Sequence, residues 1–246
     1  MNLERRAIAD CMMQQILVER GYEGKLAVVP AQAPRRPDEF DMLARIARIA
    51  DIMPGQGFIR EGDPAAHYVL VTAGCARLSK QLPDGRRAIT GFAGPGDFLG
   101  VATTDCYATT AEAIDTVRIV RYKRADIVPV LAAFPALANV LLVAAASELA
   151  AAQAHMLLLG RMNAREKLAA FLIGRVVARN RDVILTLARI DIADYLGLTV
   201  ETISRAFGAL KRDGMIAVNS AASITICDYL ALKALASGAN PRSARH

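Results

Sequence analysis

The sequence predicts an α+β chain in which an antiparallel β-roll (jelly-roll) is followed by a long helix and then a winged helix-turn-helix. Three observations lead to this prediction. From Ile52 to Tyr122, short runs with β-branched residues alternate with glycine- and proline-containing turns, which is typical of a barrel or roll. One helical pattern then covers Ala136–Leu159. Within Ile190–Leu210, two short helical patterns meet at a glycine, and two strand-like runs follow them.

The residues before the roll divide into three parts. Residues 1–25 predict a short helix, and residues 26–37, with their three prolines, predict a linker or extended arm. The amphipathic pattern of Asp38–Ile49 predicts a helix that caps the roll. We therefore expect four segments: an N-terminal extension and linker (1–37), the roll (38–135), the long helix (136–160) and the winged helix-turn-helix domain (161–246).

Five strands and one exposed hairpin tip are expected in the roll. The strands are predicted at Phe58–Ile59, Tyr68–Thr72, Cys75–Ser79, Ala88–Phe92 and Thr116–Tyr122. Between the third and fourth of these, Leu82–Arg87 forms a basic turn around Pro83-Asp84-Gly85. A short helix, Ala125–Phe134, ends the roll before Pro135.

The long helix carries an apolar seam with heptad spacing. Its members follow one another at intervals of 3, 4, 3 and 4 residues: Leu142, Ala145, Leu149, Ala152 and Met156. The helix either packs on its own domain or forms a coiled coil between two chains. The alanine-rich seam allows close helix approach, so we expect a homodimer. The apolar run Val128–Ala146 is interrupted by two prolines and Asn139, so we expect no membrane span.

The stretch Ile190–Leu210 has the pattern of two short helices packed at a steep angle. Ala193 is small enough for the backbones to approach, Gly197 suits the left-handed turn, and Thr199 can cap the second helix. The apolar positions predict one buried face of that second helix. The opposite face carries short or polar residues at helical spacing, which suits insertion into a DNA major groove: Glu201, Ser204, Arg205 and Gly208. An ordinary helix pair with a solvated face is the alternative.

Charge is distributed unevenly along the chain. Residues 1–160 hold 17 basic and 17 acidic residues, whereas residues 161–246 hold 13 and 7, so all of the net charge of +6 lies in the second part. This is the expected footprint of a phosphate-binding module joined to a neutral one. A solvated basic surface would give the same count without the coincidence with the helix pair.

The sequence gives little support to catalysis or to a metal centre. The four cysteines, Cys11, Cys75, Cys106 and Cys227, have no ligand spacing, which argues against an iron–sulfur cluster and a structural zinc. There is no glycine-rich phosphate loop, no HExxH and no Ser/His/Asp constellation. We expect a cytoplasmic protein that is not an enzyme.

Two stretches resemble the Crp/Fnr superfamily of bacterial transcription regulators, most closely its Fnr and FixK branch. His155–Arg161, running into Asn163–Leu172, resembles the end of the dimer helix and the first helix of the DNA-binding domain. Asp191–Arg205 resembles the helix-turn-helix of that branch almost residue for residue. The resemblance covers about residues 50–236 and implies a roll of the cyclic-nucleotide-binding type, a dimerisation helix and a DNA-binding domain.

The resemblance implies a double-stranded DNA target, because members with Glu-x-x-Ser-Arg on the recognition helix read palindromes resembling TTGAT-N4-ATCAA. Side-chain chemistry agrees: Arg205 can donate to guanine O6 and N7, and Glu201 can accept from cytosine N4. Ser204 can approach a thymine edge or the backbone. Thr199 and Thr202 are better placed for phosphate contacts or capping.

Three departures from the family bear on the signal. Only Cys11 lies near the N-terminus, so the iron–sulfur cluster of oxygen-sensing members cannot be built. Cyclic-nucleotide members carry Gly-Glu-Leu and an Arg-Ser/Thr pair, where this chain has Gly100-Val101-Ala102 and Thr109-Thr110. Oxygen-switched members carry an acidic residue near the position of Ala152. We therefore expect a constitutive homodimer of the FixK type that uses no cofactor.

Other possibilities stay open on the sequence alone. A ligand-gated member of the family, a haem or nitric-oxide sensor using His67 or His155, and a repressor in place of an activator are all compatible with it. Each histidine is equally an ordinary surface or packing residue. In such regulators the exposed roll hairpin often touches RNA polymerase, and the matching residues are Asp84, Arg86 and Arg87; a solvated turn tip is the alternative.

Overall fold

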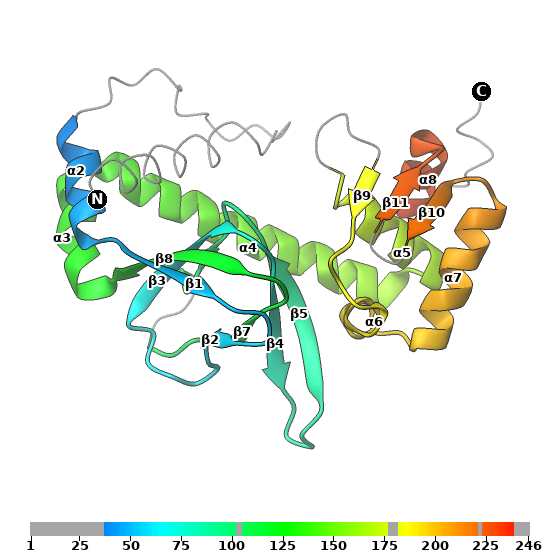
Figure 1. Ribbon diagram of the computed structural model, residues 1–246, viewed down its shortest axis with the longest axis horizontal. Helices are drawn as coiled ribbons and strands as arrows, with labels where there is room; N and C mark the ends of the chain where they lie inside the picture. The colour runs from blue at the N-terminus through cyan, green and yellow to red at the C-terminus, as the bar shows by residue number, and fades with distance from the viewer. Residues whose placement is uncertain (1–36, 102–104, 177–181, 221–222, 239–246) are drawn as a thin grey trace. The chain divides into compact units, whose positions relative to one another are not determined.

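The computed structural model describes residues 37–101, 105–176, 182–220 and 223–238 (Figure 1). The helix expected within residues 1–25 lies outside this part of the chain, as does the linker expected over residues 26–37 except for Pro37, which begins a helix. The described residues form two compact units: those of 37–80 with 90–149, and those of 81–89 with 150–238.

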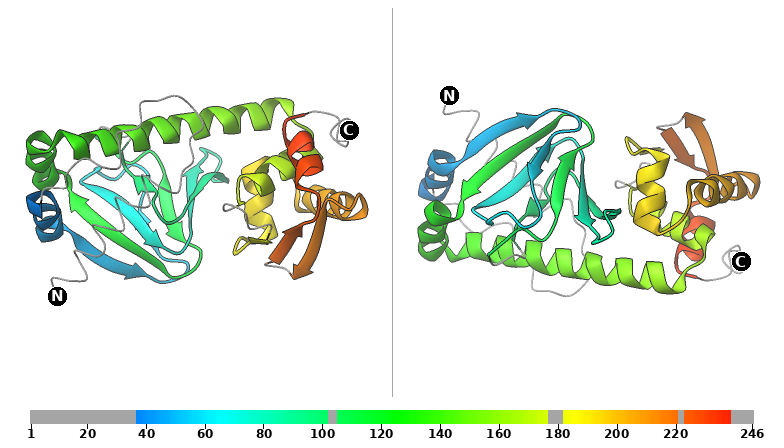
Figure 2. Two further views of the ribbon diagram at one scale, coloured as in Figure 1. Left: turned by 90° about the horizontal axis from the view of Figure 1, so that it is seen from above. Right: turned by 90° about the horizontal axis from the view of Figure 1, so that it is seen from below.

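Two four-stranded antiparallel sheets form the body of the first unit (Figure 2). Their strand orders are β1-β8-β3-β6 and β2-β7-β4-β5. The strands are β1 (Arg48–Ile52), β2 (Gly57–Ile59), β3 (His67–Ala73), β4 (Ala76–Gln81), β5 (Arg87–Ala93), β6 (Phe98–Leu99), β7 (Thr110–Ala113) and β8 (Val117–Lys123). This architecture is the β-roll that the turn and strand pattern predicts, and all five expected strands are present.

The first unit has two apolar cores, one on each face of the β1-β8-β3-β6 sheet. Successive residues of a strand point to opposite faces. Val69, Val71 and Ile119 accordingly face the core between the two sheets. Leu70 and Val120 face a second core, which is closed by helices α2 (Pro37–Ile46), α3 (Arg124–Ala133) and the start of α4 (Pro135–Arg161). This second core anchors the long helix to the roll.

The sequence prediction is wrong at the first strand. The helix expected over Asp38–Ile49 ends at Ile46, because Arg48–Ile52 pairs with Val117–Arg121 of β8. Strand β7 was also not expected. Its sequence, Thr-Ala-Glu-Ala, has little β propensity, yet Ala111 and Ala113 are buried between the sheets.

Helix α4 is 27 residues long and keeps most of its apolar surface exposed. By length and composition it could cross a membrane, and only 11% of its most apolar window is buried. The predicted seam lies on this exposed surface: Leu142, Leu149 and Met156 are 66%, 61% and 65% exposed. Ala152 is exposed and Ala145 is half-buried.

The second unit contains short helices and one small sheet. The elements are α5 (Ala164–Ile173), β9 (Asp182–Ile184), α6 (Arg189–Leu196), α7 (Val200–Arg212), β10 (Ile216–Ser220), β11 (Ser223–Ile226) and α8 (Tyr229–Ala236). Helix α5 packs against α7 and α8. The predicted hairpin of β10 and β11 is confirmed, and β9 adds an unexpected third strand by pairing with β11.

A complete capping box begins α5. The Asn163 side chain accepts hydrogen bonds from the backbone N–H groups of Arg165 (3.0 Å) and Glu166 (3.1 Å). In return, the Glu166 carboxylate accepts from the Asn163 N–H at 2.9 Å. These bonds satisfy N–H groups that a helix start leaves without partners.

Replacing this cap should destabilise the protein measurably. We expect Asn163→Ala to lower the free energy of unfolding by about 1 kcal/mol, because the acceptor for two N–H groups is lost. Asn163→Ser retains a capping oxygen and should cost only a few tenths of a kcal/mol, by the same scale. Urea denaturation measures both, and equal losses in the two variants would contradict the role of the cap.

Candidate DNA-binding site

The turn between α6 and α7 is built on Gly197, which has the left-handed conformation (φ 61°, ψ 43°). The Gly197 N–H donates to the Asp194 carbonyl at 3.2 Å, and the Leu198 N–H donates to the Ala193 carbonyl at 2.9 Å. This pair of bonds is a Schellman motif, the common way to end a helix at glycine. Ala193 is 1% exposed, as expected of the small residue at the helix crossing.

Helix α7 buries one face and exposes the other. The predicted apolar positions Ile203, Ala206, Phe207 and Leu210 are all between 0% and 6% exposed. Glu201, Ser204 and Arg205 lie on the exposed face, and Gly208 at its edge is half-buried. The structure therefore brings together the four residues that the sequence assigned to one face, on an otherwise regular helix.

Thr199 caps the start of α7, and Thr202 is the residue whose N–H it accepts from. The Thr199 hydroxyl accepts from the Thr202 N–H at 3.2 Å, and the two hydroxyl oxygens are 3.0 Å apart. Capping is one of the two roles expected for them. Ser204 donates its hydroxyl to the Val200 carbonyl at 2.8 Å, so its oxygen keeps lone pairs that can accept a hydrogen bond.

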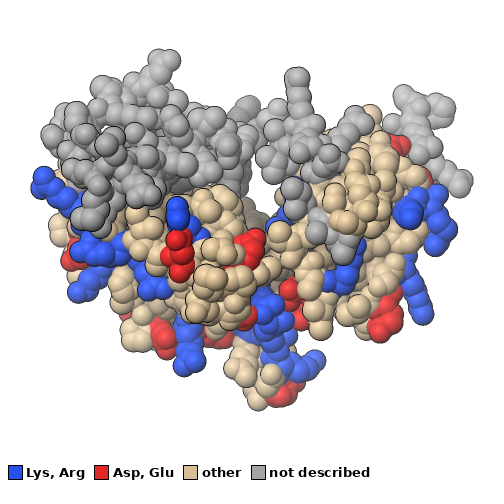
Figure 3. All heavy atoms as spheres, viewed as in Figure 1, with Lys and Arg blue, Asp and Glu red and all other residues tan. Residues whose placement is uncertain are grey.

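Glu201 and Arg205 lie one helical turn apart and carry opposite charges. The pKa of Glu201 is lowered by hydrogen bonds from its own backbone N–H and from the Thr199 hydroxyl, and by the charge of Arg205. The carboxylate therefore stays ionised at neutral pH and acts as an acceptor only. The Arg205 guanidinium is exposed beside it. Figure 3 shows basic side chains (blue) over the part of the second unit where α7 lies, with acidic side chains (red) beside them.

Arg189, at the first position of α6, was missed by the sequence reasoning. Its guanidinium carbon lies 3.6 Å from the centroid of the Phe207 ring on α7. One of its nitrogens, Nη1, is buried and has no hydrogen-bond partner within the described part of the chain. This contact with Phe207 packs the start of α6 against the buried face of α7. No spacing in the sequence indicates that Arg189 and Phe207 would meet.

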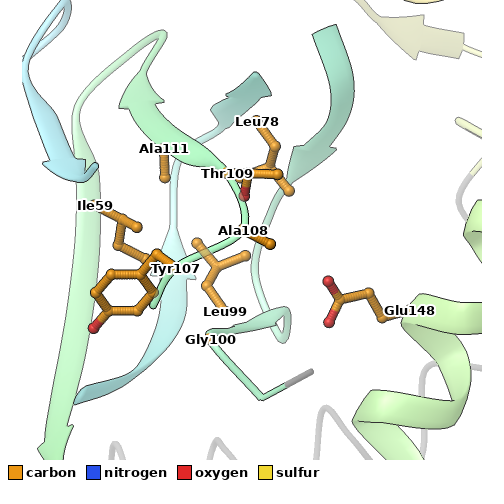
Figure 4. A pocket seen from close by; sticks show the side chains of 9 residues that line it. All are labelled: Ile59, Leu78, Leu99, Gly100, Tyr107, Ala108, Thr109, Ala111 and Glu148. Atoms are coloured by element: carbon orange, nitrogen blue, oxygen red, sulfur yellow. The ribbon is translucent and has the colours of Figure 1, made fainter. Parts of the chain in front are cut away.

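The roll contains a small cavity (Figure 4). Its volume is about 30 Å³, which is room for about two water molecules. Leu99, Tyr107 and Ala111 form much of the wall, and the Glu148 carboxylate of α4 points towards it. A Cβ atom at Gly100 would lie 2.9 Å from the Tyr107 ring, so that ring packs directly against the Gly100 backbone.

The other predicted positions lie on the hairpin tip, at the cysteines and at His67. Asp84 and Arg86 form an exposed ion pair (2.7 Å) at the tip of the β4–β5 hairpin, and Arg87 pairs with Asp191 (3.3 Å) and Asp194 (3.8 Å) of α6. Cys106 and Cys227 are exposed, Cys75 is half-buried, and Cys11 lies outside the described residues. Burial and the charges of Arg121 and Lys123 lower the pKa of His67. No group of three metal-binding side chains occurs among the described residues.

A recognition helix exposed on a winged helix-turn-helix domain, joined to a β-roll by a long helix, defines a DNA-binding regulator. Comparisons with known proteins agree. Residues 51–134 match the model of the cyclic nucleotide-binding domain, and residues 166–235 match that of the Crp-like helix-turn-helix domain.

Relatives match over most of the chain. It is 39% identical to the transcriptional activatory protein AadR of Rhodopseudomonas palustris over 78% of this chain and 82% of that protein. It is 40% identical to the nitrogen fixation regulation protein FixK of Bradyrhizobium diazoefficiens over 80% and 84%. The structure of FixK2 from Bradyrhizobium japonicum superposes with a TM-score of 0.72 at 33% identity, covering 77% of this chain and 97% of that one. The chain belongs to the Crp/Fnr family of transcription regulators, as the sequence resemblance predicted.

Removing the glycine from the α6–α7 turn should destabilise the second unit. We expect Gly197→Ala to cost about 1–2 kcal/mol, because a side chain disfavours the left-handed conformation. The new Cβ would also lie 3.3 Å from Leu159 Cδ2. Asparagine tolerates this conformation better, so Gly197→Asn should cost less. Thermal unfolding measures both variants; an alanine variant as stable as the wild type would contradict the strain argument.

Proposed function

We propose that this protein is a homodimeric transcription activator of the FixK type that reads a palindrome resembling TTGAT-N4-ATCAA and needs no bound effector. The observation that carries the proposal is the exposed Glu201-x-x-Ser204-Arg205 face at the start of α7. It combines an ionised acceptor, a short hydroxyl and a guanidinium within the first turns of a helix, which is the part of a recognition helix that meets base edges.

The donors and acceptors of this face match the half-site. Arg205 donates to O6 and N7 of the guanine, and Glu201 accepts from the N4 amino group of a cytosine. Thr199 and Thr202 lie near the DNA backbone and give register and orientation. Gly208 adds no side chain beyond Cα, which leaves the groove wall free to approach α7.

The exposed apolar face of α4 supports a homodimer. Helix α4 exposes Leu142, Leu149 and Met156 in heptad register. Their apolar surface is removed from water when the α4 helix of a second copy packs against it. Alanines 145 and 152 let the two helices approach closely. Because a second copy of the chain can cover this face, we favour a dimer helix over a membrane span. We therefore propose a protein of the cytoplasm.

The roll cavity supports function without a cyclic nucleotide. It is far smaller than a nucleotide, and the Tyr107 ring packs against the Gly100 backbone at its edge. Its one charged lining residue among those described is Glu148, whose carboxylate repels a phosphate. An effector of other chemistry, or a haem bound through His67 or His155, is the second candidate; an absorption spectrum of protein from haem-replete cells tests the haem.

Activation is proposed by analogy with AadR, whose name describes a transcriptional activator. The exposed hairpin tip with Asp84, Arg86 and Arg87 is the proposed contact with RNA polymerase. The direct test is DNA binding and in vitro transcription from a promoter carrying the palindrome, with no ligand added. Transcription above the level without protein supports the proposal, silence despite DNA binding points to a missing effector, and reduced transcription indicates a repressor.

Removing the Arg205 guanidinium should weaken DNA binding at one base pair. Arg205→Ala is expected to lose about 1–3 kcal/mol on the palindrome, since a bidentate contact to guanine disappears. On DNA in which that G·C pair is replaced, the same substitution should cost much less. Fluorescence anisotropy with both DNAs measures the difference, and equal losses on both would refute the assigned contact.

A charge in the α4 seam should weaken the dimer. Ala152→Glu places two like charges opposite each other in the proposed interface, and we expect at least about tenfold weaker association, or about 1.4 kcal/mol. Ala154 is also exposed but lies outside the seam, so Ala154→Glu is the matched control. Sedimentation of ligand-free protein at micromolar concentration measures both. A wild type that sediments as a monomer would overturn the dimer proposal.

A further inference from the structure

The last four carbonyl groups of α6 all have hydrogen-bond partners, although a helix leaves its final carbonyls without partners of its own. The Schellman turn accounts for Ala193 and Asp194. The other two carbonyls, of Tyr195 and Leu196, are bonded by side chains from other helices. His155 Nε2 lies 2.8 Å from the Tyr195 oxygen, and Lys167 Nζ donates to the Leu196 oxygen at 3.1 Å.

His155 is held against Tyr195 in two ways. Its ring stacks on the Tyr195 ring with centroids 4.1 Å apart and planes 10° from parallel. A carbonyl oxygen only accepts, so Nε2 carries the proton of this hydrogen bond. Because His155 belongs to α4, these contacts join the end of the long helix directly to the last turn of α6.

Lys167 is a buried charge at the same helix end. It is 7% exposed on α5, although lysine is seldom buried without a partner. The C-terminus of a helix carries partial negative charge, so the end of α6 suits an ammonium group. The hydrogen bond to Leu196 gives this charge an acceptor immediately before Gly197.

We propose that His155 and Lys167 are positioning residues for DNA reading. By holding the Tyr195 and Leu196 carbonyls, they fix the turn through Gly197 to Thr199 and so the direction in which α7 leaves α6. Neither residue is among those that we place against DNA. The inference rests on DNA binding by α7 and does not depend on the palindrome, the dimer or the absence of an effector.

The expected effect is a loss of affinity that is the same for every DNA sequence. Without one of these hydrogen bonds the turn samples other conformations, and apparent affinity falls in proportion to the competent fraction. Base discrimination stays unchanged, because Glu201 and Arg205 remain in place. This outcome separates a positioning residue from a base-reading one.

Two substitutions at His155 separate the hydrogen bond from the stacking. His155→Phe keeps an aromatic ring on Tyr195 but removes the donor, and we expect about tenfold weaker binding. His155→Gln keeps an N–H donor of similar reach and should bind within about threefold of the wild type. The DNA is a site selected by the wild-type protein from a random pool, so failure of the proposed palindrome leaves the test intact.

The outcomes divide clearly. A weak phenylalanine variant rescued by glutamine, with an unchanged ratio between the selected site and its single-base variants, supports the proposal. Wild-type affinity in the phenylalanine variant, equal losses in both variants, or an altered base preference would overturn it. Lys167→Met tests the second hydrogen bond with the same prediction; if thermal unfolding shows that it does not fold, the His155 pair decides alone.

Discussion

The left-handed turn at Gly197 is the constraint on which the functional part of this molecule depends. One residue with φ of 61° redirects the chain from α6 into α7 within a few residues. The buried faces of the two helices then pack together through Ala193, Ile203 and their neighbours. This packing leaves Glu201, Ser204 and Arg205 no orientation except towards solvent. The base recognition that we propose thus depends on how one helix ends, and on the side chains that hold that end.

Much of this arrangement could be predicted from the sequence because its signals are local. The glycine, the capping threonine and the apolar spacing of α7 all lie within one short stretch, and the capping box at Asn163 spans four residues. The heptad positions of α4 are likewise read from spacing alone. The hairpin of β10 and β11 follows from two strand-like runs close together in the chain.

The features that the sequence did not predict depend on partners far away in the chain. Strand β1 looks helical by its own pattern and becomes a strand because β8 pairs with it. Strand β9 exists because β11 offers it an edge. His155 looked like a packing residue or a possible haem ligand, and its position on the Tyr195 carbonyl needs the folded domain. Arg189 and Phe207 meet for the same reason.

The two halves of the chain differ in how clearly their side chains indicate a function. The second unit presents charge, capping and exposure that all point to DNA. In the roll, the small cavity with Tyr107 and Glu148 gives little room for a nucleotide and none of the positive charge that a phosphate needs, among the residues described. We therefore propose that this regulator is controlled by dimerisation through the exposed α4 face and by the amount of protein present.

Methylation interference tests the central claim most directly, because N7 of guanine is the atom that Arg205 should contact. With ligand-free protein on the TTGAT-N4-ATCAA palindrome, methylation of the guanine in either half-site should prevent binding, at two positions about one helical turn apart on opposite strands. In the Arg205→Ala variant the effect should disappear. Interference in one half-site only, or at guanines outside the palindrome, would contradict a two-fold symmetric reader built on α7.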